Sequence, residues 1–284
     1  MTEFFIADED LTGLKDKVVI LTGGSSGIGL ATANLLLSLG AKVISGDINA
    51  PTEEGAGLQF VKTNVTNWAD LVDLFKKAKE QHGRIDYVFA NAGIGPRADY
   101  LNLQADENGD PKEPTSEVLD VNLKSVVNTA TLAVHYLKQQ PEGGAIVLMG
   151  SSTGLQPVRA PDYSTAKHGV LGWARGLALL VDAAKLPIRV NTLMPSWTST
   201  NVLPDLGGMM RAVSLESQPS LVVARVAAYL MTDTSRNGDV IYVSDGKYKE
   251  IEKSVLWPAY EKHIKGDGLS DDEVLVRLLS LAGQ

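Results

Sequence analysis

Tyr163 and Lys167 lie four residues apart in the run Tyr-Ser-Thr-Ala-Lys. Residues four apart on a helix stack on one face, so this spacing places a phenol beside an ammonium group. A nearby cation favours the phenolate, and each unit by which the pKa of a tyrosine is lowered corresponds to roughly 1.4 kcal/mol of preferential stabilisation. The pair therefore predicts a tyrosine that exchanges protons with a substrate near neutral pH.

A glycine-rich run, Thr-Gly-Gly-Ser-Ser-Gly-Ile-Gly at residues 22–29, lies well upstream of this pair. It follows a predicted strand and opens a predicted helix, which is the context of a dinucleotide site. Backbone N–H groups at a helix N-terminus bind a pyrophosphate, and glycine allows its close approach. The alternative is that the glycines only serve a tight turn. The cofactor contacts predicted from this run are Gly23, Ser25, Ser26, Gly27, Ile28 and Gly29.

Asp47 stands at the end of the second predicted strand. A carboxylate at this place accepts hydrogen bonds from both hydroxyls of an adenosine ribose and repels a 2′-phosphate. Like charges about 4 Å apart cost roughly 4 kcal/mol at an effective dielectric constant near 20. Residues 24–26 and 48–49 contain no Arg or Lys to offset that repulsion. The sequence therefore favours NAD as the cofactor over NADP, unless Asp47 merely caps a turn.

The composition narrows the classes of function. With 284 residues, of which 44% are hydrophobic, the chain can bury a large core, and we expect one domain over residues 1–284. A net charge of −8 without a Lys/Arg cluster argues against a nucleic acid or an anionic membrane as partner. There is no cysteine, and the four histidines lack metal-ligand spacing, so no metal site is expected. The acidic N-terminus and the lack of a long apolar run favour a cytoplasmic protein.

Short, almost wholly apolar runs alternate with longer helical patterns along the chain. Such runs are typical of a parallel sheet covered on both faces, because one-sided sheets alternate apolar and polar residues. The predicted strands are 17–22, 42–46, 58–62, 85–90, 145–149, 188–193 and 240–243, and the predicted helices are 27–39, 68–82, 116–139, 162–184 and 220–232. This alternation of strands and helices predicts an α/β fold with a doubly wound, parallel, seven-stranded Rossmann sheet. The predicted core spans residues 14–246, and a short helical C-terminal extension follows at 247–284.

Three stretches fall outside this alternation. Residues 95–115 form a long polar loop, and residues 195–219 form a longer insertion that contains Trp197 and Leu203. Loops of this length are usually functional or disordered. The insertion either forms an apolar flap over a medium-sized hydrophobic alcohol or ketone, or packs against the sheet or the tail. Residues 254–284 carry two further helical patterns, which either cover the mouth of the site or extend a subunit interface.

The residues above resemble one family, the short-chain dehydrogenases/reductases of the single-domain Rossmann type, over residues 14–246. Residues 22–29 resemble the family's TGxxxGIG turn, and residues 91–93 resemble its Asn-Ala-Gly motif, which implies cofactor contacts from Asn91, Ala92 and Gly93. The positions that match the family's catalytic tetrad are Asn122, Ser151, Tyr163 and Lys167, with Ser152 in the variable place beside the catalytic serine.

The resemblance implies hydride transfer between a nicotinamide and a substrate carbinol carbon, with the proton leaving through Tyr163. In this scheme Ser151 hydrogen-bonds the substrate oxygen, Lys167 favours the phenolate and bridges ribose hydroxyls, and Asn122 holds a water that links Lys167 to solvent. Ser151 and Asn122 also have structural alternatives, since a serine caps turns and an asparagine satisfies helix backbone.

Two further stretches resemble cofactor contacts of the family. Asn64-Val65 resembles an Asp-Val pair at the adenine, with Asn substituted. Residues 195–200, Pro-Ser-Trp-Thr-Ser-Thr, resemble PGxxxT, which implies that Pro195, Thr198 and Thr200 close on the nicotinamide carboxamide. Ser196 replaces the usual glycine, so the turn after the sixth predicted strand is expected to differ in shape.

Within the family the chain is similar to the NAD-dependent 15-hydroxyprostaglandin dehydrogenase-like branch. The segment between Ser151 and Tyr163 is one residue shorter than is common, where that branch supplies a polar substrate contact, so a prostaglandin is not carried over. The expected substrate contacts are Ser151, Gln156, Trp197 and Leu203. The expected partners are a small alcohol or ketone and, by analogy, a second copy in a homodimer or homotetramer. Two other functions stay open: an NADPH-dependent ketoreductase of a biosynthetic pathway, and a nucleotide-sensing Rossmann protein without turnover.

Overall fold

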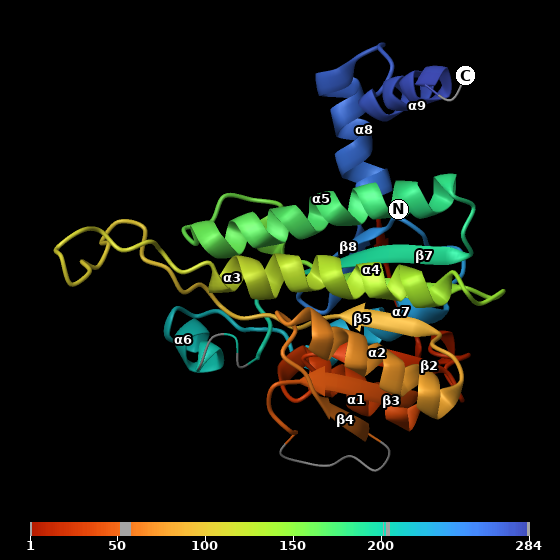
Figure 1. Ribbon diagram of the computed structural model, residues 1–284, viewed down its shortest axis with the longest axis horizontal. Helices are drawn as coiled ribbons and strands as arrows, with labels where there is room; N and C mark the ends of the chain where they lie inside the picture. The colour runs from red at the N-terminus through yellow and green to blue at the C-terminus, as the bar shows by residue number, and fades with distance from the viewer. Residues whose placement is uncertain (1, 52–57, 201, 203–204, 283–284) are drawn as a thin grey trace.

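The computed structural model describes residues 2–51, 58–200, 202 and 205–282, and shows a central sheet with helices on both faces (Figure 1). Among these residues the strands are β1 (Glu3–Phe4), β2 (Val18–Thr22), β3 (Lys42–Asp47), β4 (Leu58–Lys62), β5 (Tyr87–Ala90), β6 (Gly144–Met149), β7 (Ile188–Pro195), β8 (Val240–Ser244) and β9 (Lys247–Glu250). The helices are α1 (Gly27–Ser38), α2 (Trp68–His82), α3 (Glu117–Leu119), α4 (Ser125–Leu137), α5 (Pro161–Ala183), α6 (Leu206–Ala212), α7 (Ser220–Thr232), α8 (Trp257–Tyr260) and α9 (Asp271–Ala282).

The strands lie in the order β1-β9-β8-β7-β6-β5-β2-β3-β4, and the seven strands from β8 to β4 are all parallel. The predicted doubly wound α/β fold is confirmed, and each of the seven predicted strands and five predicted helices ends within two residues of an observed boundary. The strand order reverses between β2 and β5. Ligands of such folds bind at this switch point, beyond the carboxyl ends of the strands.

The strand count of seven was too low, because β1 and β9 add two antiparallel strands beyond β8. β9 follows β8 through a two-residue turn in which Asp245 has φ +52° and Gly246 has φ +73°. Positive φ at both central residues is the hairpin geometry that Asp-Gly favours. The Asp-Gly dipeptide was therefore a sequence feature that could have revealed β9 and was overlooked, whereas β1 has only two residues and offers no periodicity.

Two apolar layers hold the helices against the sheet. One face is covered by α2, α4 and α5, with Leu74, Phe75 and Val126 wholly buried beneath them, and Phe75 stacks on Tyr136 with ring centres 5.4 Å apart. The other face is covered by α1 and α7. Burial on both faces explains why the strands are almost continuously apolar. None of the helices in the described part of the chain is long and apolar enough to cross a membrane.

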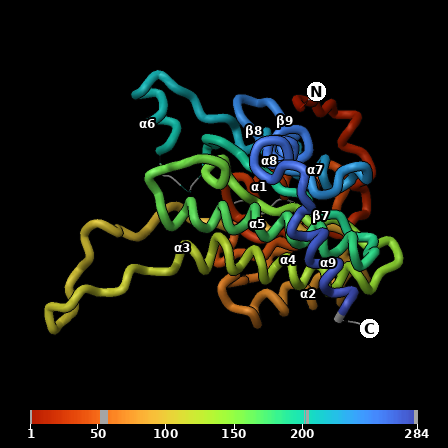
Figure 2. The backbone as a smooth tube through the Cα atoms, turned by 90° about the horizontal axis from the view of Figure 1, so that it is seen from above, coloured from red at the N-terminus to blue at the C-terminus, as the bar shows by residue number. Residues whose placement is uncertain are grey.

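The C-terminal tail stands away from this body. After β9 it runs through the π-helical turn Glu252–Leu256, α8, the π-helical turn Glu261–Lys265 and α9. Figures 1 and 2 both place α9 beyond the outer side of α5, over the C-terminal half of that helix. Tyr163 belongs to the first turn of α5, at the opposite end. The tail therefore does not cover the mouth of the site in its own chain, which removes one of the two alternatives.

Candidate functional site

The glycine-rich turn joins β2 to α1 and has a backbone that glycine alone suits. Gly23 and Gly27 have φ values of +72° and +53°. A Cβ on Gly23 would lie 2.8 Å from the Cα of Ala92, and a Cβ on Gly29 would overlap the carbonyl oxygen of Gly23. Three of the predicted turn glycines are thus fixed by conformation or close packing. The turn presents its backbone at the carboxyl end of β2, as the prediction required.

The N-terminus of α1 fits a bound pyrophosphate. Ser26 is the N-cap residue, yet its side chain makes no capping hydrogen bond, and the first turn of α1 contains no acidic residue. The side chain of Ser25 is engaged elsewhere, since its hydroxyl donates to the carbonyl of Asn49 at 2.6 Å. The first N–H groups of a helix have no partner inside the helix. The backbone at Ser26, Gly27 and Ile28 is therefore suited to hold a diphosphate, whereas the N–H of Ser25 is bonded to Asp47.

Asp47 lies beside this turn at the end of β3. Its Oδ2 accepts the N–H of Ser25 at 3.0 Å, and its Oδ1 accepts the N–H of Asn49 at 3.1 Å. Asp47 therefore does order two turns, which was the structural alternative. Each carboxylate oxygen can accept more than one hydrogen bond, so the same group can still receive ribose hydroxyls. Among the described residues no lysine or arginine forms an ion pair with Asp47.

Asn91 connects the end of β5 to the turn. Its Nδ2 donates to the carbonyl oxygens of Thr22 and Gly23 at 3.0 and 3.1 Å, while the N–H groups of Asn91 and Ala92 donate to the hydroxyl of Thr22 at 3.1 and 3.2 Å. The predicted residues Asn91, Ala92 and Gly93 thus lie directly against the glycine-rich turn. Thr22 holds the two strand ends together, a role that the sequence did not reveal.

Asn122 lies in a π-helical turn, Asp120–Lys124, between α3 and α4. The predicted helix 116–139 is therefore interrupted by a wider turn, a feature that is frequent at functional sites. The Asn122 side chain is fully buried, its Oδ1 accepts the N–H of Ile94 at 2.8 Å, and its Nδ2 donates to the Ile94 carbonyl at 2.8 Å. Asn122 thus fixes the chain that leaves the Asn-Ala-Gly motif.

Lys167 and Tyr163 lie on one face of α5, as their spacing predicted. The Nζ atom of Lys167 is 5.6 Å from the centre of the Tyr163 ring, and it donates to the carbonyl oxygen of Met149 at 2.9 Å. The lysine is 2% exposed and forms no ion pair with a described residue. Ser151 follows Met149 at the end of β6, and its Oγ accepts the N–H of Thr153 at 3.3 Å. The strand end and the helix therefore bring Ser151, Tyr163 and Lys167 to one place.

Burial is the main cause of the pKa shifts of both Tyr163 and Lys167. Burial raises the pKa of the Tyr163 phenol above its ordinary value, and a hydrogen bond with Ser151 opposes that rise. Burial lowers the pKa of Lys167 from 10.5 to about 8. In the protein without nucleotide, desolvation sets the direction of the Tyr163 shift, and the hydrogen bond of Lys167 is directed at Met149 and not at the phenol. The contact with Ser151 rather than Ser152 agrees with the choice of Ser151.

The segment after β7 folds over the glycine-rich turn. A Cβ on Gly27 would lie 3.1 Å from the Cβ of Thr200, and a hollow of about 480 Å³ is lined by Gly27, Thr200 and Leu206, among others. Thr198 is buried, with its hydroxyl bonded to the Ser196 carbonyl at 2.8 Å and to the Gln218 amide at 3.1 Å. Pro195, Thr198 and Thr200 therefore border the region where a cofactor would lie.

The other predicted contacts are placed as follows. Val65 is buried, whereas Asn64 is exposed and its Oδ1 accepts the N–H and hydroxyl of Thr66 at 3.0 and 2.8 Å, so this amide oxygen orders a local turn. Gln156 and Trp197 are both exposed at the carboxyl edge of the sheet. Leu203 lies outside the described residues.

Asp162 is a residue that the sequence reasoning missed. It is 3% exposed, its Oδ2 accepts the N–H groups of Arg97 and Ala98 at 3.0 and 3.2 Å, and its Oδ1 accepts the N–H of Tyr163 at 2.7 Å. Burial raises the pKa of Asp162, but these three N–H groups outweigh it, so the pKa lies below its ordinary value. Asp162 thus ties the beginning of the polar loop to the helix that carries Tyr163. An acidic residue beside Pro161 in the first helical turn was the visible sequence feature.

Comparison with known proteins identifies the same fold and family. The profile of the short chain dehydrogenase family matches residues 17–211. The chain is 51% identical, over 100% of its length and 97% of the relative, to "Short-chain dehydrogenase/reductase ascJ" of Acremonium egyptiacum. It is 30% identical to human 15-hydroxyprostaglandin dehydrogenase [NAD(+)], over 67% of this chain and 71% of the relative.

A solved structure shows the same arrangement. The aldohexose dehydrogenase of Thermoplasma acidophilum, in ligand-free form, superposes with a TM-score of 0.70 and 25% identity, covering 82% of this chain and 94% of the other.

Proposed function

The chain belongs to the short-chain dehydrogenase family of oxidoreductases, and from this premise we propose that it is an NAD-dependent enzyme that interconverts a secondary alcohol and a ketone. The observation that carries the proposal is the meeting of Ser151, Tyr163 and Lys167 at the carboxyl ends of the strands, next to a turn that suits a pyrophosphate. A protein that only sensed a nucleotide would have no need of this trio.

In the proposed reaction, Ser151, Tyr163 and Lys167 have different roles. The bound nicotinamide supplies the hydride acceptor or donor. Ser151 donates a hydrogen bond to the substrate oxygen, and Tyr163 takes the proton from a bound alcohol or returns it to a bound ketone. Lys167 binds ribose hydroxyls and, when protonated, favours the phenolate of Tyr163. A buried lysine whose pKa is about 8 can exchange its own proton close to neutral pH.

Asn122 supports this chemistry by position. Its two hydrogen bonds to Ile94 hold the chain that follows Gly93, beside the place proposed for the nicotinamide. An amide has two N–H groups and two lone pairs, so Asn122 keeps one donor and one acceptor site for the water proposed to link Lys167 with solvent. Asn122 lies at the middle of the π-helical turn Asp120–Lys124, and such wider turns are frequent at functional sites.

The proposed cofactor is NAD. The Asp47 carboxylate is held at the turn by the N–H groups of Ser25 and Asn49, and in this proposal it receives both ribose hydroxyls and would repel a 2′-phosphate. A second candidate, an NADP-dependent ketoreductase, would require a cation near that carboxylate. The described residues provide none in an ion pair with it, which favours NAD.

The proposed substrate is medium-sized and apolar. α6 lies within the predicted flap segment 195–219, with Leu206 and Met210 buried and Met209 exposed. Trp197 is 56% exposed and stands on the same segment after β7. Apolar side chains of this kind line sites for hydrophobic ligands. We include Ser151, Gln156, Trp197 and Leu203 as substrate contacts, in a cytoplasmic enzyme that works without a metal ion.

A panel of secondary alcohols, assayed with NAD and with NADP by absorbance at 340 nm, tests the proposal. We expect reduction of NAD by at least one medium-sized apolar alcohol, and a larger rise in melting temperature with NAD than with NADP at equal concentration. A larger stabilisation by NADP would favour the ketoreductase alternative. Stabilisation by NAD with no turnover of any alcohol or ketone would favour the sensing protein.

A further inference from the structure

Gln218 is a buried side chain to which neither the sequence motifs nor the proposed reaction gives a role. It is 7% exposed and lies directly before Pro219, the N-cap residue of α7. Its Nε2 donates to the hydroxyl of Thr198 and to the carbonyl of Val243, both at 3.1 Å, and its Oε1 accepts the N–H of Gly246 at 3.4 Å. One amide therefore joins the segment after β7, the end of β8 and the turn before β9, with both of its N–H groups used.

The backbone of Gln218 closes the flap segment at its base. Its N–H donates to the carbonyl of Trp197 at 2.9 Å, and its carbonyl accepts the N–H of Ser199 at 2.9 Å. These two bonds form an isolated parallel bridge, so the segment that leaves β7 and the segment that enters α7 lie side by side. We call residues 197–199 together with 217–220 the neck. The described residues between its two halves, α6 included, therefore start and end at one fixed place.

The bridge also sets the direction of the Thr198 backbone. Successive peptide groups of an extended segment point to opposite sides, and the Trp197 carbonyl and the Ser199 N–H both point at Gln218. The N–H and carbonyl of Thr198 therefore point the other way, and neither has a hydrogen-bond partner among the described residues. Thr198 borders the region where the cofactor would lie. An N–H beside a carbonyl complements a carboxamide, which carries an acceptor oxygen and an NH₂ donor.

The side-chain contacts of Gln218 tie this orientation to the sheet. The Val243 carbonyl accepts the N–H of Ser196 at 2.8 Å as well as the Gln218 amide, so one strand residue holds both the turn after β7 and the neck. Val243 is wholly buried and pairs with Pro195 of β7 on one side and with Tyr248 of β9 on the other. The neck is therefore fixed to a strand that is paired on both sides, and not to another loop.

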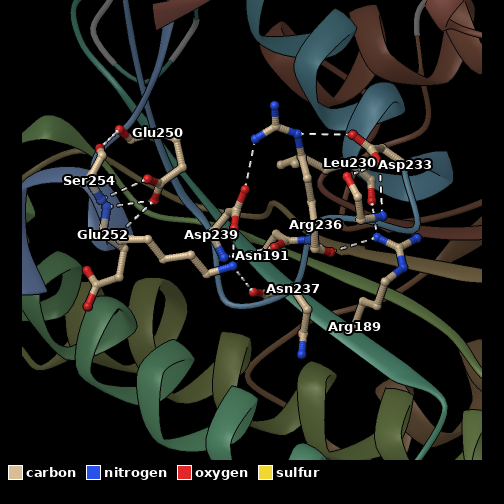
Figure 3. A network of polar contacts seen from close by, with 12 residues as sticks. Arg189, Asn191, Leu230, Asp233, Arg236, Asn237, Asp239, Glu250, Glu252 and Ser254 are labelled. Atoms are coloured by element: carbon tan, nitrogen blue, oxygen red, sulfur yellow. Dashed lines mark hydrogen bonds and ion pairs between the residues drawn. The ribbon is translucent and has the colours of Figure 1, made fainter. Parts of the chain in front are cut away.

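The hairpin of β8 and β9 is also held at its far end, which Figure 3 shows. Asp239, just before β8, accepts from Nη1 of Arg236 at 2.8 Å and from Nζ of Lys253 at 2.7 Å. Glu250, at the end of β9, accepts the N–H of Lys253 at 3.1 Å. The hairpin is therefore held at both ends, by this cluster and by Gln218, and gives the neck a rigid support.

We propose that Gln218 is a positioning residue, which holds the neck so that the backbone N–H and carbonyl of Thr198 meet the nicotinamide end of the cofactor. The inference rests on the proposed function, because it takes the bound nucleotide from there, and it adds a residue outside the predicted tetrad and cofactor contacts. Methionine is also long and unbranched, but it has no amide. In Gln218→Met the neck keeps its packing and loses three side-chain hydrogen bonds, so Thr198 is no longer held in place.

Equilibrium binding of NAD and of ADP-ribose, which lacks the nicotinamide ring, tests the proposal. In Gln218→Met we expect the affinity for NAD to fall by roughly tenfold or more, and that for ADP-ribose to change by less than about twofold. The reason is that the proposed diphosphate and adenosine contacts at Gly27 and Asp47 are untouched. The ratio of the two affinities therefore separates positioning of the nicotinamide end from a general loss of structure.

The matched control is Gln140→Met. Gln140 is also a buried glutamine, 8% exposed, and its side chain makes three hydrogen bonds to backbone groups at the amino ends of β5 and β6, far from the neck. The control should lower the melting temperature about as much as Gln218→Met does, and should leave the ratio of the NAD and ADP-ribose affinities unchanged.

Ser220→Ala gives a second variant, at a position that is not fully buried. The Ser220 hydroxyl donates to the Ser199 carbonyl at 2.6 Å across the neck, so its loss should shift the same ratio in the same direction by a smaller factor. Hydrogen exchange adds a readout without nucleotide. The Ser199 N–H, bonded to the Gln218 carbonyl, should exchange faster in Gln218→Met than in the unchanged protein or in Gln140→Met.

Equal losses of NAD and ADP-ribose affinity in Gln218→Met, or no loss of either, would overturn the positioning role and leave Gln218 with a structural one. If Gln218→Met does not fold, an unaltered ratio in Ser220→Ala overturns it instead. Failure of the proposed function looks different. An unchanged protein that binds NAD without turning over any alcohol or ketone refutes the enzyme and leaves the ratio test intact, whereas one that does not bind NAD refutes both.

Discussion

The Nζ atom of Lys167 lies 5.6 Å from the centre of the Tyr163 ring, with its hydrogen bond directed at the Met149 carbonyl and not at the phenol. The two groups share one helix face, but in the protein alone burial sets the pKa of each: it raises that of Tyr163 and lowers that of Lys167 to about 8. The protein therefore holds an acid and an amine near each other, with the charged form of both disfavoured by desolvation.

Replacing Tyr163 by Phe removes the proposed proton carrier without changing the ring. We expect turnover to fall by about a thousandfold or more, because positioned acid–base groups contribute typically 10² to 10⁴. The affinity for NAD should stay near normal, since the contact to Lys167 and the turn at Gly23 are untouched. Steady-state rates and equilibrium binding of NAD check the two halves. Substantial residual turnover in the Phe variant would refute the acid–base role.

Replacing Asp47 by Ser should shift the choice of nucleotide. The repulsion between this carboxylate and a 2′-phosphate is worth roughly 4 kcal/mol at an effective dielectric near 20, which corresponds to about a thousandfold in relative affinity. We expect the ratio of NADP to NAD affinity to rise by up to that factor. Asp47→Asn should shift the ratio in the same direction, because it removes the charge while it keeps one acceptor oxygen for the turn. If neither variant alters the ratio, the ribose of the cofactor does not lie at Asp47.

Much of this fold was predictable because its sequence features are local. Apolar runs located the seven parallel strands, and spacing placed Tyr163 and Lys167 on one helix face. The position of Asp47 beside Ser25 follows from two adjacent parallel strands ending at the same edge. Each of these features depends on periodicity or on the order of strands, and both are present in the linear sequence.

The features that were missed depend on contacts between distant segments. Asp162 accepts N–H groups of Arg97 and Ala98, about 65 residues away, and no local pattern identifies that partner. The direction of the Tyr163 shift without nucleotide could not be predicted, because burial of the phenol depends on the packed site and not on the four-residue spacing. The contact that fixes the base of the C-terminal tail likewise joins distant residues, since Arg175 and Glu252 are 77 positions apart.

Replacing Asn122 by Ala should reduce both stability and turnover. The N–H and carbonyl of Ile94 would each lose a partner at 2.8 Å in a partly buried place, and a polar group left unsatisfied on burial costs about 1 to 3 kcal/mol. We expect the free energy of unfolding to fall by about 2 to 4 kcal/mol and kcat to fall by tenfold or more. The control is Asn128→Ala, which changes another asparagine further along the same helical segment, in α4. Chemical denaturation and initial rates measure the two effects, and an Ala variant as stable as wild type would contradict the assigned contact.

Replacing Asp162 by Asn tests whether it positions the polar loop. An amide can keep one acceptor, but its NH₂ group would face N–H donors of Arg97 and Ala98 or of Tyr163. We expect KM for the alcohol to rise several-fold with a smaller change in kcat, since the loop start moves while Tyr163 keeps its hydroxyl. Glu113→Gln, which changes an exposed carboxylate of the same loop, is the control. A fall in kcat with an unchanged KM would assign Asp162 to the chemical step and contradict a positioning role.

The lowered pKa of Lys167 makes a signed prediction for the stability of the protein without nucleotide. The unfolded lysine titrates near 10.5 and the folded one near about 8, so between these pH values the unfolded state binds more protons. The free energy of unfolding therefore rises with pH across that window, with a slope approaching about 1.4 kcal/mol per pH unit, and is flat below about 8. Lys167→Met lacks this dependence. The difference in unfolding free energy between wild type and the Met variant, measured by urea denaturation from pH 7 to 9.5, should shift by roughly 2 kcal/mol in favour of wild type as pH rises. A difference that is constant over this range would show that Lys167 keeps an ordinary pKa, and the amine would then be a permanent cation beside Tyr163 at neutral pH.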